Sequence, residues 1–312
     1  MKQKRKIVFL ILMVVLGTAL ALAVLIKLYN HNKAPHISFS DWIAVQPIAA
    51  KDHQFRFAIA SMISAEETWV TYKELIDYVA SQIGDEASMV LRPSYSDVRI
   101  LLEEKKVDLA LVCTGTYIMC SRAKTVDLIA VPEFKKDFKY RCLFVVNSKS
   151  TIKGVKDLNG KSFAFTDPES NTGCIVPSWL IWKEGIAPKD YFSEIMHTGS
   201  HDRSLHVVAK GLVDGASVDS LIYYSFIEKH PKMKGLLRVI WESEPFGAPP
   251  VVAPSGLSES KKERLREIFL SMHKDAEARE ILDGIGIERF RLPQSGEYNS
   301  AHEIWDTFHT PQ

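Results

Sequence analysis

Four consecutive residues in the middle of the 312-residue chain combine groups that bind small anions. Ser170, Asn171 and Thr172 supply two hydroxyls and an amide, and Gly173 follows them at the predicted start of a helix. A helix N-terminus has unpaired backbone N–H groups and the positive end of the helix dipole, so it can receive an oxyanion without lysine or arginine. Ser, Thr and Asn are also favoured as ordinary helix caps. The pattern therefore indicates either an oxyanion site or a capped helix.

Other polar side chains lie directly after predicted strands. Thr114 and Thr116 follow one strand, His201 lies at a strand-to-helix junction, and Asp219 follows another strand. Ligands of open α/β sheets bind at the carboxyl ends of the strands, so we expect these residues at a cleft edge. A histidine there can donate a hydrogen bond to an oxyanion, and its charge would respond to the anion. A solvated histidine and a capping aspartate are the plainer alternatives.

Strands and helices must alternate to position these residues. Apolar runs predict the strands, and helical spacing from Tyr72 to Ile83, after the capping-box pair Ser64 and Glu67, predicts a helix that ends at Gly84. The order of elements implies an α/β fold with a mostly parallel sheet and helices on both faces. The predicted strands are residues 55–60, 89–91, 107–113, 163–165 and 213–218.

A short pattern occurs twice. Val-Asp-x-Ala-x-Val begins at Val107 and again at Val213, and each copy follows an amphipathic helix. With matching elements around both copies, the repeat suggests two similarly built α/β lobes rather than one continuous sheet.

The N-terminal region differs from the remainder of the chain. Residues 1–6 are basic and predicted to be cytoplasmic, and residues 7–27 are apolar up to the closing Lys27. A run this long predicts a transmembrane signal-anchor, with a cleaved signal peptide as the alternative. The basic flank places the remaining residues outside the cytoplasm, at the periplasmic face of the inner membrane or free in the periplasm. Residues 28–53 read as a stalk, and residues 54–312 as the substrate-binding domain.

Composition and cysteine spacing restrict the partners. The 39 basic and 38 acidic side chains nearly cancel, so no global field indicates nucleic acid as a partner. Cys113, Cys120, Cys142 and Cys174 show no CxxC metal spacing. Disulfides are possible in an exported protein, and buried free thiols are the alternative. We expect neither a metal nor a cofactor.

One stretch resembles the signature of a known family. Residues 163–177 read FAFTDPESNTGCIVP, which resembles the D-P-x-S-x-[ST]-G-x-x-x-P pattern of the periplasmic substrate-binding proteins of phosphonate, phosphite and phosphate ABC transporters. Residues 199–202, 213–220 and 241–252 look like later landmarks of the same family, in order and at suitable intervals. The resemblance covers about residues 55–290.

The resemblance implies a type II periplasmic-binding fold with a ligand cleft between two lobes. The chain would cross between the lobes near residues 138–143 and 243–251. Lobe 1 would comprise about residues 54–138 and 250–312, and lobe 2 about residues 139–249. In the family a hydroxyl-rich trio, a histidine and two tyrosines hold the anion. Carried over by position, these are Ser170, Asn171, Thr172, His201, Tyr95 and Tyr140.

The chain departs from the family pattern in ways that bear on the ligand. Asn171 replaces the usual middle threonine, and Leu221 and Pro249 stand where aminophosphonate binders place acidic residues. A ligand ammonium group would lack its counter-charges there. Asp219 could replace one of them, or could share a proton with a protonated ligand oxygen. We therefore expect a compact oxyanion or a phosphonate with an uncharged substituent.

The predicted function is that of a non-enzymatic solute-binding component of an ABC importer, which closes over a small oxyanion and delivers it to an ABC permease. One alternative is a membrane-tethered sensor of the same ligands that signals through a partner. Another is an enzyme that uses Cys174, His201 and Asp202 as a nucleophilic set. A buried core position is the plainer reading of Cys174, because it lies inside the predicted helix.

Overall fold

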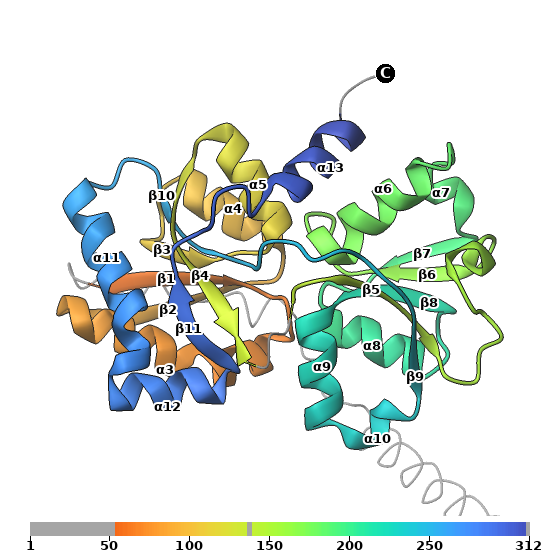
Figure 1. Ribbon diagram of the computed structural model, residues 1–312, viewed down its shortest axis with the longest axis horizontal. Coiled ribbons are helices and arrows are strands. Elements are labelled where there is room, and N and C mark those ends of the chain that lie inside the picture. Colours follow the sequence, from red (N-terminus) through yellow and green to blue (C-terminus); the bar gives the residue numbers. More distant parts are fainter. Residues whose placement is uncertain (1–53, 136–138, 310–312) are drawn as a thin grey trace, which may run out of the picture. The chain divides into compact units, whose positions relative to one another are not determined.

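A computed structural model describes residues 54–135 and 139–309 of the chain, which form two α/β lobes (Figure 1). The predicted basic segment, transmembrane segment and stalk, residues 1–53, lie outside the described residues. Among the helices that are described, none is long and apolar enough to cross a membrane.

Lobe 1 contains a six-stranded sheet in the order β11-β4-β10-β3-β1-β2. Helices α3 and α12 lie on one side of this sheet in Figure 1, and α4 and α5 on the other. Its strands are β1 (Gln54–Ala60), β2 (Glu86–Arg92), β3 (Leu109–Leu111), β4 (Val126–Phe134), β10 (Val251–Pro254) and β11 (Ile287–Arg291). Its helices are α3 (Ala65–Ile83), α4 (Tyr95–Glu103), α5 (Thr114–Ala123), α11 (Glu259–Ser271), the short η4 (Met272–Lys274) and α12 (Ala276–Gly284).

Lobe 2 contains a five-stranded sheet in the order β7-β6-β8-β5-β9. Helices α6 and α7 lie on one side of it in Figure 1, and α8, α9 and α10 on the other. Its strands are β5 (Cys142–Asn147), β6 (Ser162–Phe165), β7 (Glu194–His197), β8 (Gly215–Asp219) and β9 (Leu237–Glu242). Its helical segments are η2 (Val155–Leu158), η3 (Asn171–Ile175), α6 (Val176–Trp182), α7 (Pro188–Tyr191), α8 (His201–Ala209), α9 (Ser220–Lys229) and α10 (Pro231–Lys234).

Most strands of each sheet run in one direction, as predicted, but each sheet also contains antiparallel pairs that the sequence did not reveal. In lobe 1, β10 runs antiparallel to both β3 and β4, and in lobe 2, β5 runs antiparallel to both β8 and β9. Each of these strands enters its sheet from the other lobe. It therefore does not arrive through the helical crossover that makes successive strands parallel.

The local sequence signals that position the elements are confirmed. The Ser64 hydroxyl accepts the N–H of Glu67 at the start of α3, and Gly84 ends that helix in the left-handed conformation with φ 83°. In β5 the side chains alternate between two cores, as a strand covered on both faces requires. Cys142, Phe144 and Val146 pack with the core beneath α6, and Leu143 and Val145 with the core beneath α8.

The repeated Val-Asp pattern marks equivalent positions in the two lobes. The Asp108 carboxylate accepts the backbone N–H of Arg56 at 2.7 Å, and the Asp214 carboxylate accepts that of Ser162 at 2.9 Å. The partner lies 52 residues earlier in both cases. Each aspartate thereby fixes a parallel strand pair, β1 with β3 and β6 with β8. The prediction of two similarly built lobes is confirmed.

The chain passes between the lobes after β4 and again after β9, and the last helix contacts both of them. This helix, α13 (Asn299–His309), packs against α5 and α6 (Figure 1). Ile304 joins the core of lobe 2, whereas Ala301 packs with Ile118 of lobe 1. The expectation that residues 250–312 belong to lobe 1 alone therefore overlooked this helix.

Candidate functional site

The loop after β6 holds lobe 2 against lobe 1. The Asp167 carboxylate accepts the backbone N–H of Tyr95 at 3.1 Å, at the start of α4. The Glu169 carboxylate pairs with Arg99 of α4 at 2.9 Å and accepts the hydroxyl of Thr116 in α5 at 3.3 Å. The acidic residues of the Asp-Pro-Glu-Ser run thus join the lobes.

A second set of contacts joins the lobes at the start of α8. The backbone N–H of His201 donates to the Met62 carbonyl at 3.0 Å, and the N–H of Ser64 donates to the Asp202 carboxylate at 3.2 Å. The lobes thus contact each other both at the loop after β6 and at the start of α8, and the residues between these two sets of contacts are enclosed.

The turn that begins at Ser170 has an uncommon form. Residues Asn171–Ile175 form a π-helical turn, and the Ser170 hydroxyl accepts the N–H of Gly173 at 3.0 Å. A Cβ on Gly173 would lie 1.7 Å from Oγ1 of Thr166, so only glycine fits there. π-helical turns occur often at functional sites. Ser170 is a helix cap, as one reading of the sequence expected, and its hydroxyl proton remains available for donation.

Three of the predicted ligand residues around this turn have buried polar atoms without a hydrogen-bond partner, and so does the neighbouring Thr166. The atoms of the three predicted ligand residues are the hydroxyls of Tyr95 and Thr172, each with 0% exposure, and the amide nitrogen of Asn171 with 2%. The Tyr140 hydroxyl lies 3.9 Å from the Cys113 sulfur, which is a weak partner. Buried polar groups are almost always paired, and an unpaired one costs about 1–3 kcal/mol. These atoms are therefore arranged for a partner that is not part of the chain.

Both tyrosines remain hydrogen-bond donors at neutral pH. Burial raises the pKa of Tyr95 and of Tyr140 well above the usual 10. The Ser170 hydroxyl lies near enough to counter part of the rise in the Tyr95 pKa, although its geometry falls short of a hydrogen bond. Asn171 and Thr172 act in the same way on the pKa of Tyr140. The hydroxyls of both tyrosines therefore lie close to the side chains of the turn.

His201 is buried and neutral. Burial lowers its pKa from 6.5 to about 3, and the nearby Asp202 counters only part of this effect. At neutral pH its ring is therefore uncharged in this structure, and the expected response of its charge to a bound anion stays a prediction. Its Nδ1 accepts the N–H of Asp219 at 3.1 Å, so the proton is on Nε2, which faces the Ser170 hydroxyl at 3.5 Å. His201 is thus a fixed neutral donor.

Asp219 is also buried, and it caps α9 by accepting the N–H of Leu221 at 2.7 Å. Burial raises the pKa of the Asp219 carboxyl from 3.8 to about 7, with the N–H groups of Leu221 and Ile222 countering part of the rise. Near neutral pH this carboxyl is therefore partly protonated, and it can donate or accept one hydrogen bond.

We refer to six residues as the donor cluster: Tyr95, Tyr140, Ser170, Asn171, Thr172 and His201. None of the six carries a charge at neutral pH. A set of fixed neutral donors can bind the oxygens of a compact anion once water is excluded.

Two predicted ligand residues have other partners, and the sequence reasoning missed one neighbour of the cluster. The Thr114 hydroxyl donates to the Gly247 carbonyl at 2.8 Å, and that of Thr116 donates to Glu169. Both connect chain segments rather than join the donor cluster. Cys113 contacts the cluster, because its sulfur accepts the N–H of Asn171 at 3.4 Å. Its place at the end of a predicted strand was the available signal.

The proposed nucleophilic set does not form. The two ring nitrogens of His201 face Ser170 and the N–H of Asp219, so neither is directed at Cys174. The Cys174 sulfur instead lies 4.0 Å from the Ser178 hydroxyl, and burial raises its pKa to about 11. A thiol with this pKa is a poor nucleophile at neutral pH. All four cysteines are free, so the alternative of buried thiols, not the disulfide, is the one observed.

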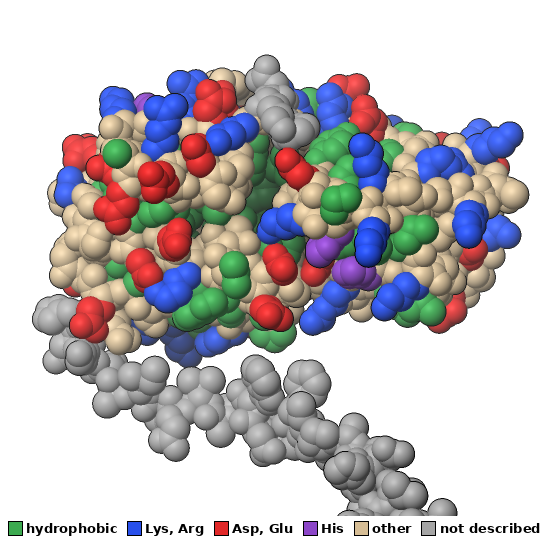
Figure 2. Space-filling view, turned by 90° about the horizontal axis from the view of Figure 1, so that it is seen from below, with side chains coloured by type: hydrophobic (Ala, Val, Ile, Leu, Met, Phe, Trp, Pro, Cys, Tyr) green, Lys and Arg blue, Asp and Glu red, His purple; other side chains and the backbone are tan. Residues whose placement is uncertain are grey.

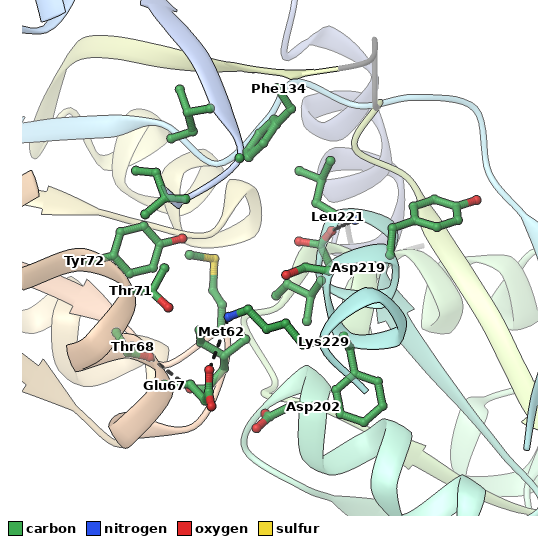
Figure 3. A pocket seen from close by; sticks show the side chains of 18 of the residues that line it. Met62, Glu67, Thr68, Thr71, Tyr72, Phe134, Asp202, Asp219, Leu221 and Lys229 are labelled. Atoms are coloured by element: carbon green, nitrogen blue, oxygen red, sulfur yellow. Dashed lines mark hydrogen bonds and ion pairs between the residues drawn. The ribbon is translucent and has the colours of Figure 1, made fainter. Parts of the chain in front are cut away.

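A cavity of about 610 Å³ lies between the lobes beside the donor cluster. Figure 2 shows a hollow between them with hydrophobic side chains at its depth and charged side chains around its mouth. Asp219 and Leu221 line this cavity (Figure 3), as does Pro249, whereas the residues of the donor cluster are buried and are not part of its lining.

The two lobes and the enclosed donor cluster define the class of two-lobed solute-binding proteins. The family model described as "ABC transporter, phosphonate, periplasmic substrate-binding protein" matches residues 57–298. The chain belongs to this family. The predicted family is therefore confirmed.

Individual relatives agree with this assignment. The probable ABC transporter phosphite binding protein PhnD1 of Prochlorococcus marinus is 25% identical over 196 residues, 59% of this chain and 66% of the relative, just under two thirds of its length. The phosphonates-binding periplasmic protein of Escherichia coli is 24% identical over 266 residues, 81% of this chain and 77% of the relative. The structure of PhnD1 with methylphosphonate superimposes with a TM-score of 0.73 at 21% identity, covering 82% of this chain and 98% of that one. This likeness shows the two-lobed fold.

Proposed function

We propose that the donor cluster binds a phosphorus oxyanion, namely a phosphonate, phosphite or phosphate, and that the two lobes close over it. The observation that carries the proposal is the unpaired state of three buried polar atoms, on Tyr95, Asn171 and Thr172. A tetrahedral oxyanion supplies several acceptor oxygens within one small volume. It would therefore satisfy donors that the chain leaves unpaired.

The donors come from both lobes, and this explains why binding would favour closure. Tyr95 belongs to α4 of lobe 1, whereas the turn from Ser170 and His201 belong to lobe 2. An anion held by both lobes binds the closed form better than the open one, so it shifts the population toward closure. Asp219 at the edge of the site shares one proton with the ligand, either as a donor or as an acceptor from a P–OH group.

The proposed biological role is transport, as the names of the relatives suggest. In this role the closed form delivers its ligand to an ABC permease, and the chain itself performs no chemistry on it. The apolar segment 7–27 would hold the domain at the periplasmic face of the membrane. We further propose that the ligand lacks an ammonium group, because the uncharged Leu221 and Pro249 line the cavity.

Calorimetry with phosphite, methylphosphonate, phosphate and sulfate tests the proposed ligand class. We expect at least one phosphorus oxyanion to bind more tightly than sulfate. His201→Ala should weaken that binding by about 1–3 kcal/mol, because a hydrogen bond to a charged group is lost. His197→Ala is the matched control, since His197 is exposed on the same lobe. The proposal is wrong if no phosphorus oxyanion binds, or if His201→Ala has no larger effect than His197→Ala.

A further inference from the structure

The cavity beside the donor cluster is much larger than a compact oxyanion needs. Its volume is about 610 Å³. Water in the liquid occupies roughly 30 Å³ per molecule, so methylphosphonate, with five non-hydrogen atoms, needs on the order of 100–150 Å³. Cavities of roughly 300–1,000 Å³ typically enclose organic ligands of greater size. A compact anion in the donor cluster would therefore leave most of this space to water.

Many side chains along the inner walls of the cavity are apolar and come from both lobes, with the Asp219 carboxyl among them. Figure 3 shows Met62 and Tyr72 on the lobe 1 side, Leu221 on the lobe 2 side, and Phe134 at one end. Water gains little from such walls, whereas an apolar group placed among them is removed from water at both surfaces. The walls thus favour an apolar occupant over bulk solvent.

Charged groups also line the cavity, and two ion pairs lie toward its mouth; Asp202 and Glu228 line it as well and belong to neither pair. Lys229 of α9 reaches Glu67 of α3 at 3.3 Å, which joins the two lobes across the opening (Figure 3). Lys135 pairs with Asp283 on lobe 1 at 2.6 Å. These ion pairs lie in the outer part of the cavity, so they leave the apolar inner walls to the ligand.

Asp219 connects the cavity with the donor cluster. Its side chain lines the cavity, and its backbone N–H holds Nδ1 of His201 at 3.1 Å. The Asp219 carboxyl also lies close enough to Tyr95 and Tyr140 to affect the titration of both phenols. A substituent on the phosphorus of an anion in the donor cluster can therefore extend past Asp219 into the cavity.

Resting on the proposed function, we infer that the ligand is a phosphonate or phosphate monoester whose phosphorus carries an uncharged, apolar substituent about the size of a ring. The oxyanion binds the donor cluster, and the substituent fills the space between Tyr72, Phe134 and Leu221. The cavity rather than the donor cluster then sets the preference among phosphorus compounds.

The test compares phenylphosphonate with methylphosphonate by calorimetry on the protein with both lobes intact. We expect phenylphosphonate to bind at least about tenfold more tightly, because the ring buries more apolar surface than the methyl group. It should also displace methylphosphonate competitively, since both use the donor cluster.

Two variants that fill the cavity from opposite lobes identify where the ring binds. Leu221→Trp and Thr71→Phe should each reduce the ratio of the two affinities to about threefold or less. Leu212→Trp is the control, because Leu212 is 63% exposed on lobe 2 and does not line the cavity. Melting temperatures identify any variant that fails to fold. If only one of the two cavity-filling variants folds, that variant alone is sufficient for the test.

The possible failures are distinguishable. If methylphosphonate binds but phenylphosphonate binds no more tightly, the inference about the substituent is wrong and the proposed function stands. The inference is also wrong if 2-aminoethylphosphonate binds more tightly than phenylphosphonate. The inference is wrong as well if a folded cavity-filling variant keeps the full ratio of phenylphosphonate to methylphosphonate affinity, because the ring then binds elsewhere. If no phosphorus oxyanion binds at all, the proposed function fails and the inference fails with it.

Discussion

Strand β1 of lobe 1 and its counterpart β6 of lobe 2 lead into different kinds of helix. In lobe 1, β1 is followed by α3, a regular helix of 19 residues. Its first turn is satisfied by the Ser64 cap, and the Thr68 hydroxyl bonds the Ser64 carbonyl at 2.8 Å. In lobe 2, β6 is followed by a loop and a π-helical turn, in which Asn171 and Thr172 leave polar atoms unpaired.

The scaffold around these two helices is otherwise repeated. Asp108 and Asp214 fix equivalent strand pairs with the same separation of 52 residues. The difference teaches that the site lies where lobe 2 departs from the repeat. The start of α3 uses the Thr68 hydroxyl for its own stability, whereas the turn in lobe 2 leaves polar atoms of Asn171 and Thr172 unpaired, beside the unpaired Tyr95 hydroxyl of lobe 1. Each unpaired group costs about 1–3 kcal/mol, which binding would recover.

The largest expected effect comes from breaking the turn that distinguishes lobe 2. Gly173→Ala places a Cβ 1.7 Å from Oγ1 of Thr166 and 2.8 Å from the Ser170 hydroxyl. We expect it to lower the free energy of unfolding by about 3 kcal/mol, at the upper end of the overpacking range, and to weaken phosphonate binding more than about 100-fold.

Gly235→Ala is the matched control, because its backbone is helical and nothing lies within 4 Å of the added Cβ. Chemical denaturation and calorimetry measure both quantities. The added Thr166→Ala change should restore part of the stability of Gly173→Ala, because it removes the closest contact. Equal behaviour of the two glycine variants would contradict the close packing of the turn.

The next effect separates the unpaired hydroxyls of the site from the paired hydroxyl of α3. Thr172→Val and Tyr95→Phe each remove a buried hydroxyl that has no partner. Both should weaken phosphonate binding by about 10–100-fold while leaving the ligand-free protein as stable or more stable. Thr68→Val removes a buried hydroxyl that is bonded, so it should destabilise the ligand-free protein by about 1 kcal/mol. Thermal melts without ligand show whether each variant is more or less stable than the wild type. A clear loss of stability in both site variants would contradict the comparison.

Much of the scaffold could be predicted from the sequence because its signals are local. The cap Ser64, the terminating Gly84 and the apolar run of residues 55–60 each act within a few positions of the chain. The antiparallel strands were missed for the opposite reason. Whether β5 and β10 run parallel or antiparallel depends on the passage of the chain between lobes, which no short pattern reports.

The candidate site was predicted in outline, through the family resemblance, and the details depended on distant contacts. Thr114 and Thr116 have suitable side chains directly after a strand, but Gly247 and Glu169 use their hydroxyls. The neutral state of His201 follows from burial beneath both lobes, and the sequence alone does not show that burial. Side-chain types suggest which residues can bind, whereas packing determines which of them are still unpaired.

A smaller effect concerns two buried titratable groups of lobe 2 whose contributions to stability oppose each other. The pKa of Asp219 rises from 3.8 to about 7 on folding, so its protonated form is favoured, and its contribution to stability is lost as the pH rises from about 4 to 7. The pKa of His201 falls from 6.5 to about 3, so its contribution is lost as the pH falls from about 6.5 to 3. Between about pH 4 and 6.5 the two groups change the free energy of unfolding with pH in opposite directions, so their effects cancel.

Substituting one of the two residues should reveal how the other makes the stability of the ligand-free protein depend on pH. Relative to the wild type, Asp219→Asn should become less stable as the pH falls from 6.5 to 4, by at most about 1.4 kcal/mol per pH unit. His201→Gln should instead become less stable as the pH rises from 4 to 7. Melting temperatures across this range provide the measurement. Parallel curves for wild type and both variants would mean that neither group is buried in solution as it is here.

The smallest expected effect tests the part of the scaffold that the lobes share. Asp108→Ala and Asp214→Ala each remove the carboxylate that accepts a backbone N–H of the neighbouring strand. Each should lower the free energy of unfolding by about 1 kcal/mol, because both sites are reached by water and the N–H groups can be resolvated. Asp214→Ala should cost slightly more, since its carboxylate also accepts the Ser162 hydroxyl at 2.8 Å. Phosphonate binding should change by less than about twofold in either variant, because the strands remain paired and the donor cluster is intact. A large loss of binding in only one of the two variants would show that the repeated scaffold is not equivalent in the two lobes. The aspartate of that lobe would then also position the site.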